Sequence, residues 1–110
     1  MDEAKRLYPD EPWKENALRH AIWQYLMTCA FGSQAAKDIG DIHEDVSNDP
    51  CDSAIDQYNN EVARQLAAQG GCSGSLEDLI NMLIQHIENG DFVTDPTDPR
   101  VRDACPQSNQ

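Results

Sequence analysis

The sequence has few basic residues and no long apolar run. It has 8 Lys and Arg against 20 Asp and Glu, a formal net charge of −12. Nucleic-acid-binding proteins present basic faces, so this deficit argues against DNA or RNA as a partner, and equally against an anionic membrane surface. No segment approaches the roughly 20 apolar residues that a membrane-spanning helix requires. A basic protein partner, a metal ion or a small substrate is compatible with the charge.

Several signals and motifs are missing. Residues 1–6 lack the apolar stretch of a signal peptide, which is compatible with cytosolic residence, with a processed or excised domain, or with export by another route. There is no C-x-x-C pair of a zinc ribbon or thioredoxin-like centre, no H-E-x-x-H of zinc proteases and no G-x-S-x-G nucleophile elbow. None of these motifs is therefore present to indicate a particular catalytic activity.

The four cysteines allow up to two disulfides in three pairings. Cys51, Cys72 and Cys105 fall in or next to expected loops or the tail, where a disulfide could join non-helical segments. Cys29 lies within an apolar helical stretch and could instead be a plain buried residue. Its apolar setting makes it an unconvincing nucleophile.

The apolar periodicity predicts an all-α domain, a compact bundle of about four short helices. We expect a single domain over residues 1–110, with a helical core over about 13–90. Pro9 and Pro12 predict an extended N-terminal lead-in, and residues 91–110 predict an irregular tail with a weak strand candidate at 92–94. The helices are expected at about 13–31, 34–46, 52–69 and 76–88, the last opened by a capping box at Ser75 and Asp78.

The second expected helix, over about 34–46, contains a glycine. Gly40 weakens a helix by roughly 1 kcal/mol relative to Ala, unless a neighbouring helix packs closely there. The residues expected to face the core are Ala35, Ile39, Ile42 and Val46.

The first helix carries polar residues that packing does not require. Asn16, Arg19, His20 and Trp23 follow each other at i, i+3, i+4 and i+7, on one face. An arginine can clamp an anion, and a histidine can act as a general base, a general acid or a metal ligand. The structural alternative is a histidine hydrogen-bonded at the edge of the core, with Trp23 packed beside it.

The second and third helices carry comparable groups. His43 and Glu44 end the second helix, where the carboxylate could orient His20; the alternative is a solvent-exposed pair. In the third helix, Asn59 and Asn60 together cost roughly 1 kcal/mol of helix propensity. A side-chain amide usually compensates by binding a substrate, a metal-bound water or a neighbouring loop.

If these three faces converge, they form a polar cleft. Its members would be His20, His43, Glu44, Asp56 and Asn60, with Arg19 nearby. A zinc ion held by His20, His43 and either Asp56 or Glu44 is chemically reasonable, although no spacing in the chain is diagnostic of it.

The pattern N-x-x-R-H-A-x-W, then H-E, then D-x-x-N-N resembles a family of small bacterial domains of unassigned activity. Such domains often lie at the C-terminal ends of secreted or polymorphic-toxin proteins. The resemblance covers residues 13–67 and departs from the pattern at Ala63, where the family has glycine before the arginine. It implies an exported, effector-like domain, and it favours disulfides and an extracytoplasmic setting. The functional residues that it implies are His20, His43, Glu44, Asp56 and Asn60.

We therefore expect a hydrolase-like effector or toxin domain. His20 would act as general base, Glu44 or Asp56 would orient it or a metal, and Arg19 and Asn60 would stabilise an anionic intermediate. The alternative is a non-catalytic acidic module, of the immunity or adaptor type, that masks a basic partner. A third possibility is a metal-binding domain without catalysis.

Overall fold

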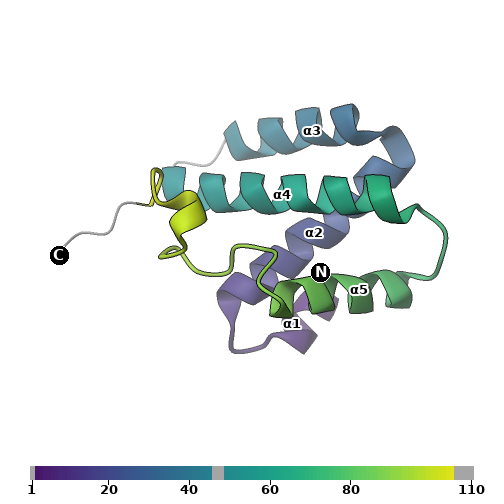
Figure 1. Cartoon of the computed structure of the whole chain (residues 1–110), viewed down its shortest axis with the longest axis horizontal. Coiled ribbons are helices and arrows are strands. Elements are labelled where there is room, and N and C mark those ends of the chain that lie inside the picture. Colours follow the sequence, from purple (N-terminus) through teal and green to yellow (C-terminus); the bar gives the residue numbers. More distant parts are fainter. Residues whose placement is uncertain (1, 46–48, 106–110) are drawn as a thin grey trace.

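The described part of the molecule is mostly helical, and its helices are arranged around the long second helix (Figure 1). The structure is a computed structural model that describes residues 2–45 and 49–105, without the side chains of residues 2, 3 and 43–45. The elements are α1 (Asp2–Leu7), α2 (Pro12–Phe31), α3 (Ser33–Asp45), α4 (Pro50–Gly70), α5 (Leu76–Glu88) and a 3₁₀ helix, η1 (Pro99–Val101). The described residues form no strand, so the all-α prediction is confirmed and the weak strand candidate at 92–94 is not a strand.

The helices form one layer crossed by α2. In Figure 1, α4 lies between α3 and α5, and α2 crosses behind them. Helix α2 contacts α1, α3, α4 and α5. No described helix is long and apolar enough to cross a membrane.

The N-terminal segment is helical, not extended as predicted. Ala4, Leu7 and Tyr8 recur at helical spacing, and Ala4 and Tyr8 are buried in the main core. The Tyr8 hydroxyl also donates a hydrogen bond to Glu88, at 2.9 Å. Pro9 and Pro12 follow α1, so the prolines separate two helices and do not keep the lead-in extended.

The helix ends follow local sequence signals. Asp49 caps α4, accepting hydrogen bonds from the backbone N–H groups of Cys51 and Asp52, so α4 begins slightly before the expected residue. The predicted cap of α5 is confirmed, because the Ser75 hydroxyl accepts from the Asp78 N–H at 3.0 Å. Gly32 ends α2 with a positive φ of 92°.

Helix α3 packs through small residues, not through its isoleucines. Ile39 and Ile42, expected in the core, expose 39% and 66% of their surface, whereas Ala36 and Gly40 are buried. A Cβ atom at Gly40 would lie 2.8 Å from Gln24 Nε2. The close approach of α3 to α2 therefore requires glycine there, and it turns the isoleucines outward. Val46, also expected inside, lies outside the described residues.

Both disulfides form. Cys29 pairs with Cys72, which joins α2 to the segment before α5, and Cys51 pairs with Cys105, which joins the start of α4 to the segment after η1. Cys29 is thus a disulfide partner and not a plain buried residue. Disulfides are typical of proteins in oxidising compartments.

Asn59 holds the segment after α5 against α4. Its side-chain amide donates to the Val93 carbonyl at 2.9 Å, and its carbonyl accepts from the Val93 N–H at 2.8 Å. Val93 then packs with Ile55, Val101 and Cys105 in a second, smaller apolar cluster. The irregular tail is confirmed up to residue 105, and residues 106–110 are outside the described part.

Candidate functional site

Four of the polar residues meet between α2 and α4. Asn16 and His20 lie one turn apart on α2, and Asp56 and Asn60 lie one turn apart on α4. The Asn16 amide donates to Asp56 Oδ1 at 2.8 Å. The His20 ring lies between the other two groups, with Nε2 3.4 Å from Asp56 Oδ2 and Nδ1 3.2 Å from Asn60 Oδ1. We call these four residues the His20 cluster.

The His20 ring is held at both nitrogens. Only 11% of the His20 side chain and 14% of the Asp56 side chain are exposed. A neutral imidazole donates from one nitrogen only, whereas the imidazolium ion donates from both. The observed contacts therefore fit either the imidazolium, or a neutral ring that donates to Asp56 while the Asn60 amide is rotated to donate to Nδ1.

Trp23 flanks the histidine on α2. The two rings are close to perpendicular, with an interplanar angle of 82° and their centroids 6.4 Å apart. This edge-to-face arrangement is one of the favourable geometries for a pair of aromatic rings. The two side chains expected on one face of α2 thus do share a face.

A buried polar pair, Gln24 and Arg64, lies one turn further along α2 and α4 than His20 and Asn60. Gln24, fully buried, donates to the Ala36 carbonyl at 3.2 Å and accepts from Arg64 Nη1 at 3.1 Å. Arg64 Nη2 also donates to Glu61, at 2.6 Å. Sequence reasoning missed Gln24, although it lies one turn after His20 on the same helix, a spacing that could have pointed to it.

The two asparagines of α4 have different environments. Asn59 binds the backbone of Val93, which confirms the loop-tying interpretation for that residue. Asn60 contacts His20, and its Nδ2 lies 3.3 Å from where a Gly40 Cβ would be. Only Asn60 belongs to the His20 cluster.

The remaining predicted site residues are not joined to the cluster by any described contact. The guanidinium of Arg19 donates to Glu15, one turn earlier on α2, at 2.7 Å. His43 and Glu44 lie in the last turn of α3, and their side chains are outside the described residues. No three His, Cys, Asp or Glu side chains in the described part are placed to hold a metal ion. Zinc therefore stays a prediction that depends on His43.

The start of α4 is electrostatically negative. Partial burial, with the neighbouring carboxylates of Asp49 and Asp56, raises the pKa of Asp52 above its usual range. This end of the cluster would repel anionic groups more than neutral or cationic ones.

A family model, Domain of unknown function (DUF6973), matches residues 1–91. The chain belongs to this family. The match covers α1 to α5 and all residues of the His20 cluster, and it extends beyond the resemblance over residues 13–67. A comparison with curated proteins and a comparison with solved structures each found no match.

Proposed function

We propose that the His20 cluster is the general acid–base centre of a hydrolytic site. The observation that supports this most is the contact between His20 and Asp56. It joins two helices, and more than four-fifths of each side chain is buried. A carboxylate beside one nitrogen of an imidazole orients the ring and stabilises the imidazolium that forms during proton transfer.

Each residue of the cluster has a role in such a reaction. Asp56 would accept a hydrogen bond from Nε2–H, which leaves Nδ1 as the base, and Asn16 holds the other oxygen of Asp56. A water bound in place of the Asn60 contact gives its proton to Nδ1 as its oxygen attacks the electrophilic carbon or phosphorus of the substrate. The imidazolium then returns the proton to the leaving group. Asn60 and Arg19 would stabilise the anionic intermediate, Arg19 after leaving its ion pair with Glu15.

Residues at the end of α3 would complete the site. Helix α3 packs against both α2 and α4, and its last turn carries His43 and Glu44. In a metal-assisted version of the reaction, His20, His43 and Asp56 would hold zinc, which would supply an activated water. Elemental analysis of the purified protein tests this version, because it predicts about one zinc per chain.

The biological setting belongs to the same proposal. The two disulfides favour an oxidising compartment, and the motif pattern resembles domains of exported bacterial toxins. We propose an exported, extracytoplasmic effector whose activity a basic partner or a cognate immunity protein would mask; cytoplasmic residence is the alternative.

One observation favours a second function, a non-catalytic acidic binding module. Both ring nitrogens of His20 face protein oxygens, as in a purely structural histidine. The net charge of −12 would then be the functional feature. Partner binding that weakens strongly with salt and ignores substitution of His20 would support this alternative.

The test is a comparison of His20→Ala with wild type. The protein is directed to the periplasm or the cytoplasm of bacterial cells, growth is followed, and purified protein is assayed on chromogenic esters, amides, glycosides and phosphodiesters. His20→Ala is expected to lose toxicity and at least about 100-fold of any turnover. The matched control is His86→Ala, because His86 also contacts an aspartate, Asp91, at 2.7 Å. Equal activity of His20→Ala and wild type, with the fold intact, would contradict the proposal.

A further inference from the structure

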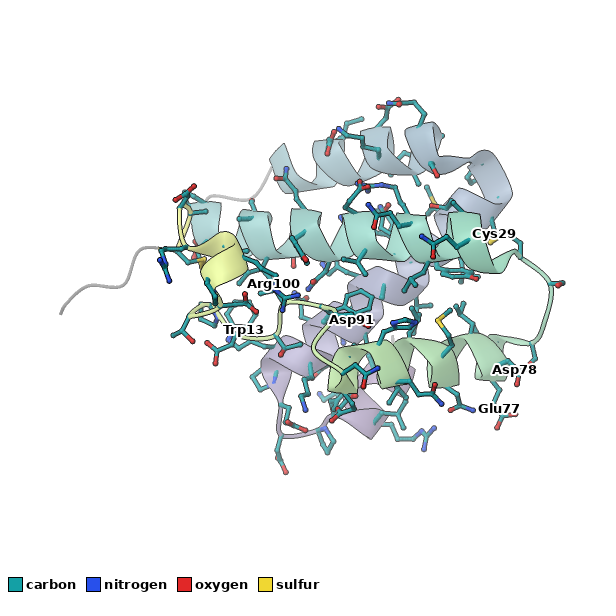
Figure 2. All side chains as sticks on the ribbon, viewed as in Figure 1. Trp13, Cys29, Glu77, Asp78, Asp91 and Arg100 are labelled. Carbon is teal, nitrogen blue, oxygen red and sulfur yellow. A yellow bond between two sulfur atoms is a disulfide. The ribbon has the colours of Figure 1, made fainter. Side chains whose placement is uncertain are left out.

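A hollow of about 330 Å³ lies at the end of the molecule away from the His20 cluster. It is formed by the second half of α2, the glycine-rich segment after α4 and the start of α5. Figure 2 shows Cys29 and Asp78 at this end and Trp13 at the opposite one. Its apolar walls come from Tyr25, Leu26, Cys29, Leu76, Leu79 and Met82. We call it the Cys29–Cys72 pocket.

Large apolar side chains are exposed at this pocket. Leu26 exposes 46% of its surface and Leu76 exposes 55%. Single exposed leucines are common, but two that line the same hollow mark a place where an apolar group can be buried. The volume lies at the small end for ligand sites and suits one large side chain.

The pocket is formed before anything binds, and cross-links hold its walls together. The Cys29–Cys72 disulfide fixes one wall, and the Tyr25 hydroxyl donates to the Gly71 carbonyl at 2.7 Å. Ser75 caps α5 at the third wall. A preformed pocket loses less conformational entropy on binding than a flexible one.

The pocket carries a single charge, which is negative. Asp78 is the one charged residue among those that line it, and no ion pair among the described residues involves its carboxylate. The neighbouring Glu77 lines a different hollow, of about 410 Å³, together with Arg6. An occupant with an apolar group and a positive charge could pack against the apolar walls and pair with Asp78.

We propose that the Cys29–Cys72 pocket binds a large apolar side chain of a basic partner protein, with an adjacent Lys or Arg of that partner paired to Asp78. The net charge of −12 favours such a partner over an acidic one. An aromatic or aliphatic anchor in a preformed pocket is the usual centre of a protein interface. This proposal does not depend on hydrolysis at the His20 cluster.

Three short peptides test the proposal, with the central orders Lys-Trp-Lys, Glu-Trp-Glu and Lys-Ala-Lys. Each is titrated into the ¹⁵N-labelled, oxidised full chain and followed by NMR. We expect Lys-Trp-Lys alone to bind, shifting the amide signals of Leu26, Gly71, Cys72 and Leu79. Binding by Glu-Trp-Glu or Lys-Ala-Lys of equal strength, shifts confined to other surfaces, or no binding by any peptide would overturn the proposal.

Matched variants separate the pocket from general charge and general apolar surface. Leu26→Ser should weaken Lys-Trp-Lys binding about tenfold, and Asp78→Asn about fivefold. Glu77→Gln and Ile39→Ser, which change a neighbouring charge and an exposed side chain on α3, should leave the dissociation constant within about twofold. The pocket proposal would be contradicted if Asp78→Asn and Glu77→Gln changed the dissociation constant equally. It would also be contradicted if Leu26→Ser and Ile39→Ser did so.

His20→Ala keeps the two proposals distinguishable. This variant should bind Lys-Trp-Lys like wild type while losing turnover. Parallel loss of peptide binding in a folded His20→Ala protein would contradict an independent pocket.

Discussion

The part of the chain that the structure describes contains two His–Asp pairs with opposite surroundings. His20 contacts Asp56 between two helices, with 11% and 14% of the side chains exposed, and the pair is embedded in contacts from Asn16 and Asn60. His86 contacts Asp91 five residues later in the chain, with 32% and 49% exposed. The same two residue types therefore form a buried tertiary network in one place and a local contact at a helix end in the other. What distinguishes a candidate site is the embedding of the pair, not its composition.

The largest difference in turnover and stability should appear between the variants Asp56→Ala and Asp91→Ala. Asp56→Ala leaves the Asn16 amide and the His20 ring without their acceptor, so we expect turnover to fall about 100-fold or more and stability to fall by about 1–3 kcal/mol. Asp91→Ala should cost less than about 1 kcal/mol, because its pair is exposed, and should leave turnover unchanged. Urea unfolding and the activity assay measure both quantities. Equal effects at the two positions would remove the distinction between the pairs.

The adjacent asparagines allow a second comparison, between structural and site residues. Asn59→Ala leaves the buried N–H and C=O groups of Val93 without partners, at about 1–3 kcal/mol each. The folded fraction should keep its specific activity, whereas Asn60→Ala should lower turnover. Unfolding curves together with activity per folded molecule provide the measurement. A loss of activity confined to Asn59→Ala would reverse the assignment of the two residues.

The stability of the variant Gly40→Ala tests whether α3 must pack closely against α2 beside the His20 cluster. Replacing a helical glycine by alanine normally stabilises a helix by roughly 0.5–1 kcal/mol. Here the new Cβ would lie 2.8 Å from Gln24 Nε2, so Gly40→Ala should instead destabilise the protein by about 1–3 kcal/mol. Asp38→Ala, on the exposed side of α3, is the control for thermal unfolding. A stabilised Gly40→Ala protein would show that α3 is free to move away from α2.

The smallest change in stability is expected for Glu88, the last residue of α5. Hydrogen bonds from Lys14 and Tyr8 hold the pKa of Glu88 below its usual value. Because that pKa is lower in the folded state, the stabilisation is present above the unfolded-state pKa and is lost as the pH falls through the folded-state pKa. Wild type should exceed Glu88→Gln in stability at neutral pH, and the difference should disappear once the pH falls below the folded-state pKa of Glu88. A difference that is independent of pH would contradict this origin.

Periodic signals predicted most of the fold. Local sequence predicted the four longer helices, the Ser75 cap and the end of α2 at Gly32, because each of these features depends on neighbouring residues. The helical lead-in was missed because Ala4 and Tyr8 are buried in a core made of residues far along the chain, which local sequence does not show.

Helix α3 shows why apolarity alone misplaces a helix face. Its isoleucines predicted the buried side, yet the helix is buried through Ala36 and Gly40. The deciding interaction is the contact of Gly40 with Gln24 and Asn60, two polar residues from other helices. Such a three-body fit follows only from the tertiary arrangement.

The candidate site was predicted in part. Helical spacing brought His20 together with Asn16, and Asp56 together with Asn60, and the structure joins the two pairs. Spacing could not show that Asn59 points to Val93, because neighbours on a helix diverge by about 100°. The roles of Arg19, His43 and Glu44 stay predictions.

The most direct test compares the two histidines. Wild type, His20→Ala and His86→Ala are assayed side by side for turnover on the same substrate, with thermal unfolding confirming that each is folded. A catalytic His20 cluster predicts turnover lowered about 100-fold or more by His20→Ala and unchanged by His86→Ala. Equal turnover by all three folded proteins would contradict it and would leave His20 as a structural residue between α2 and α4.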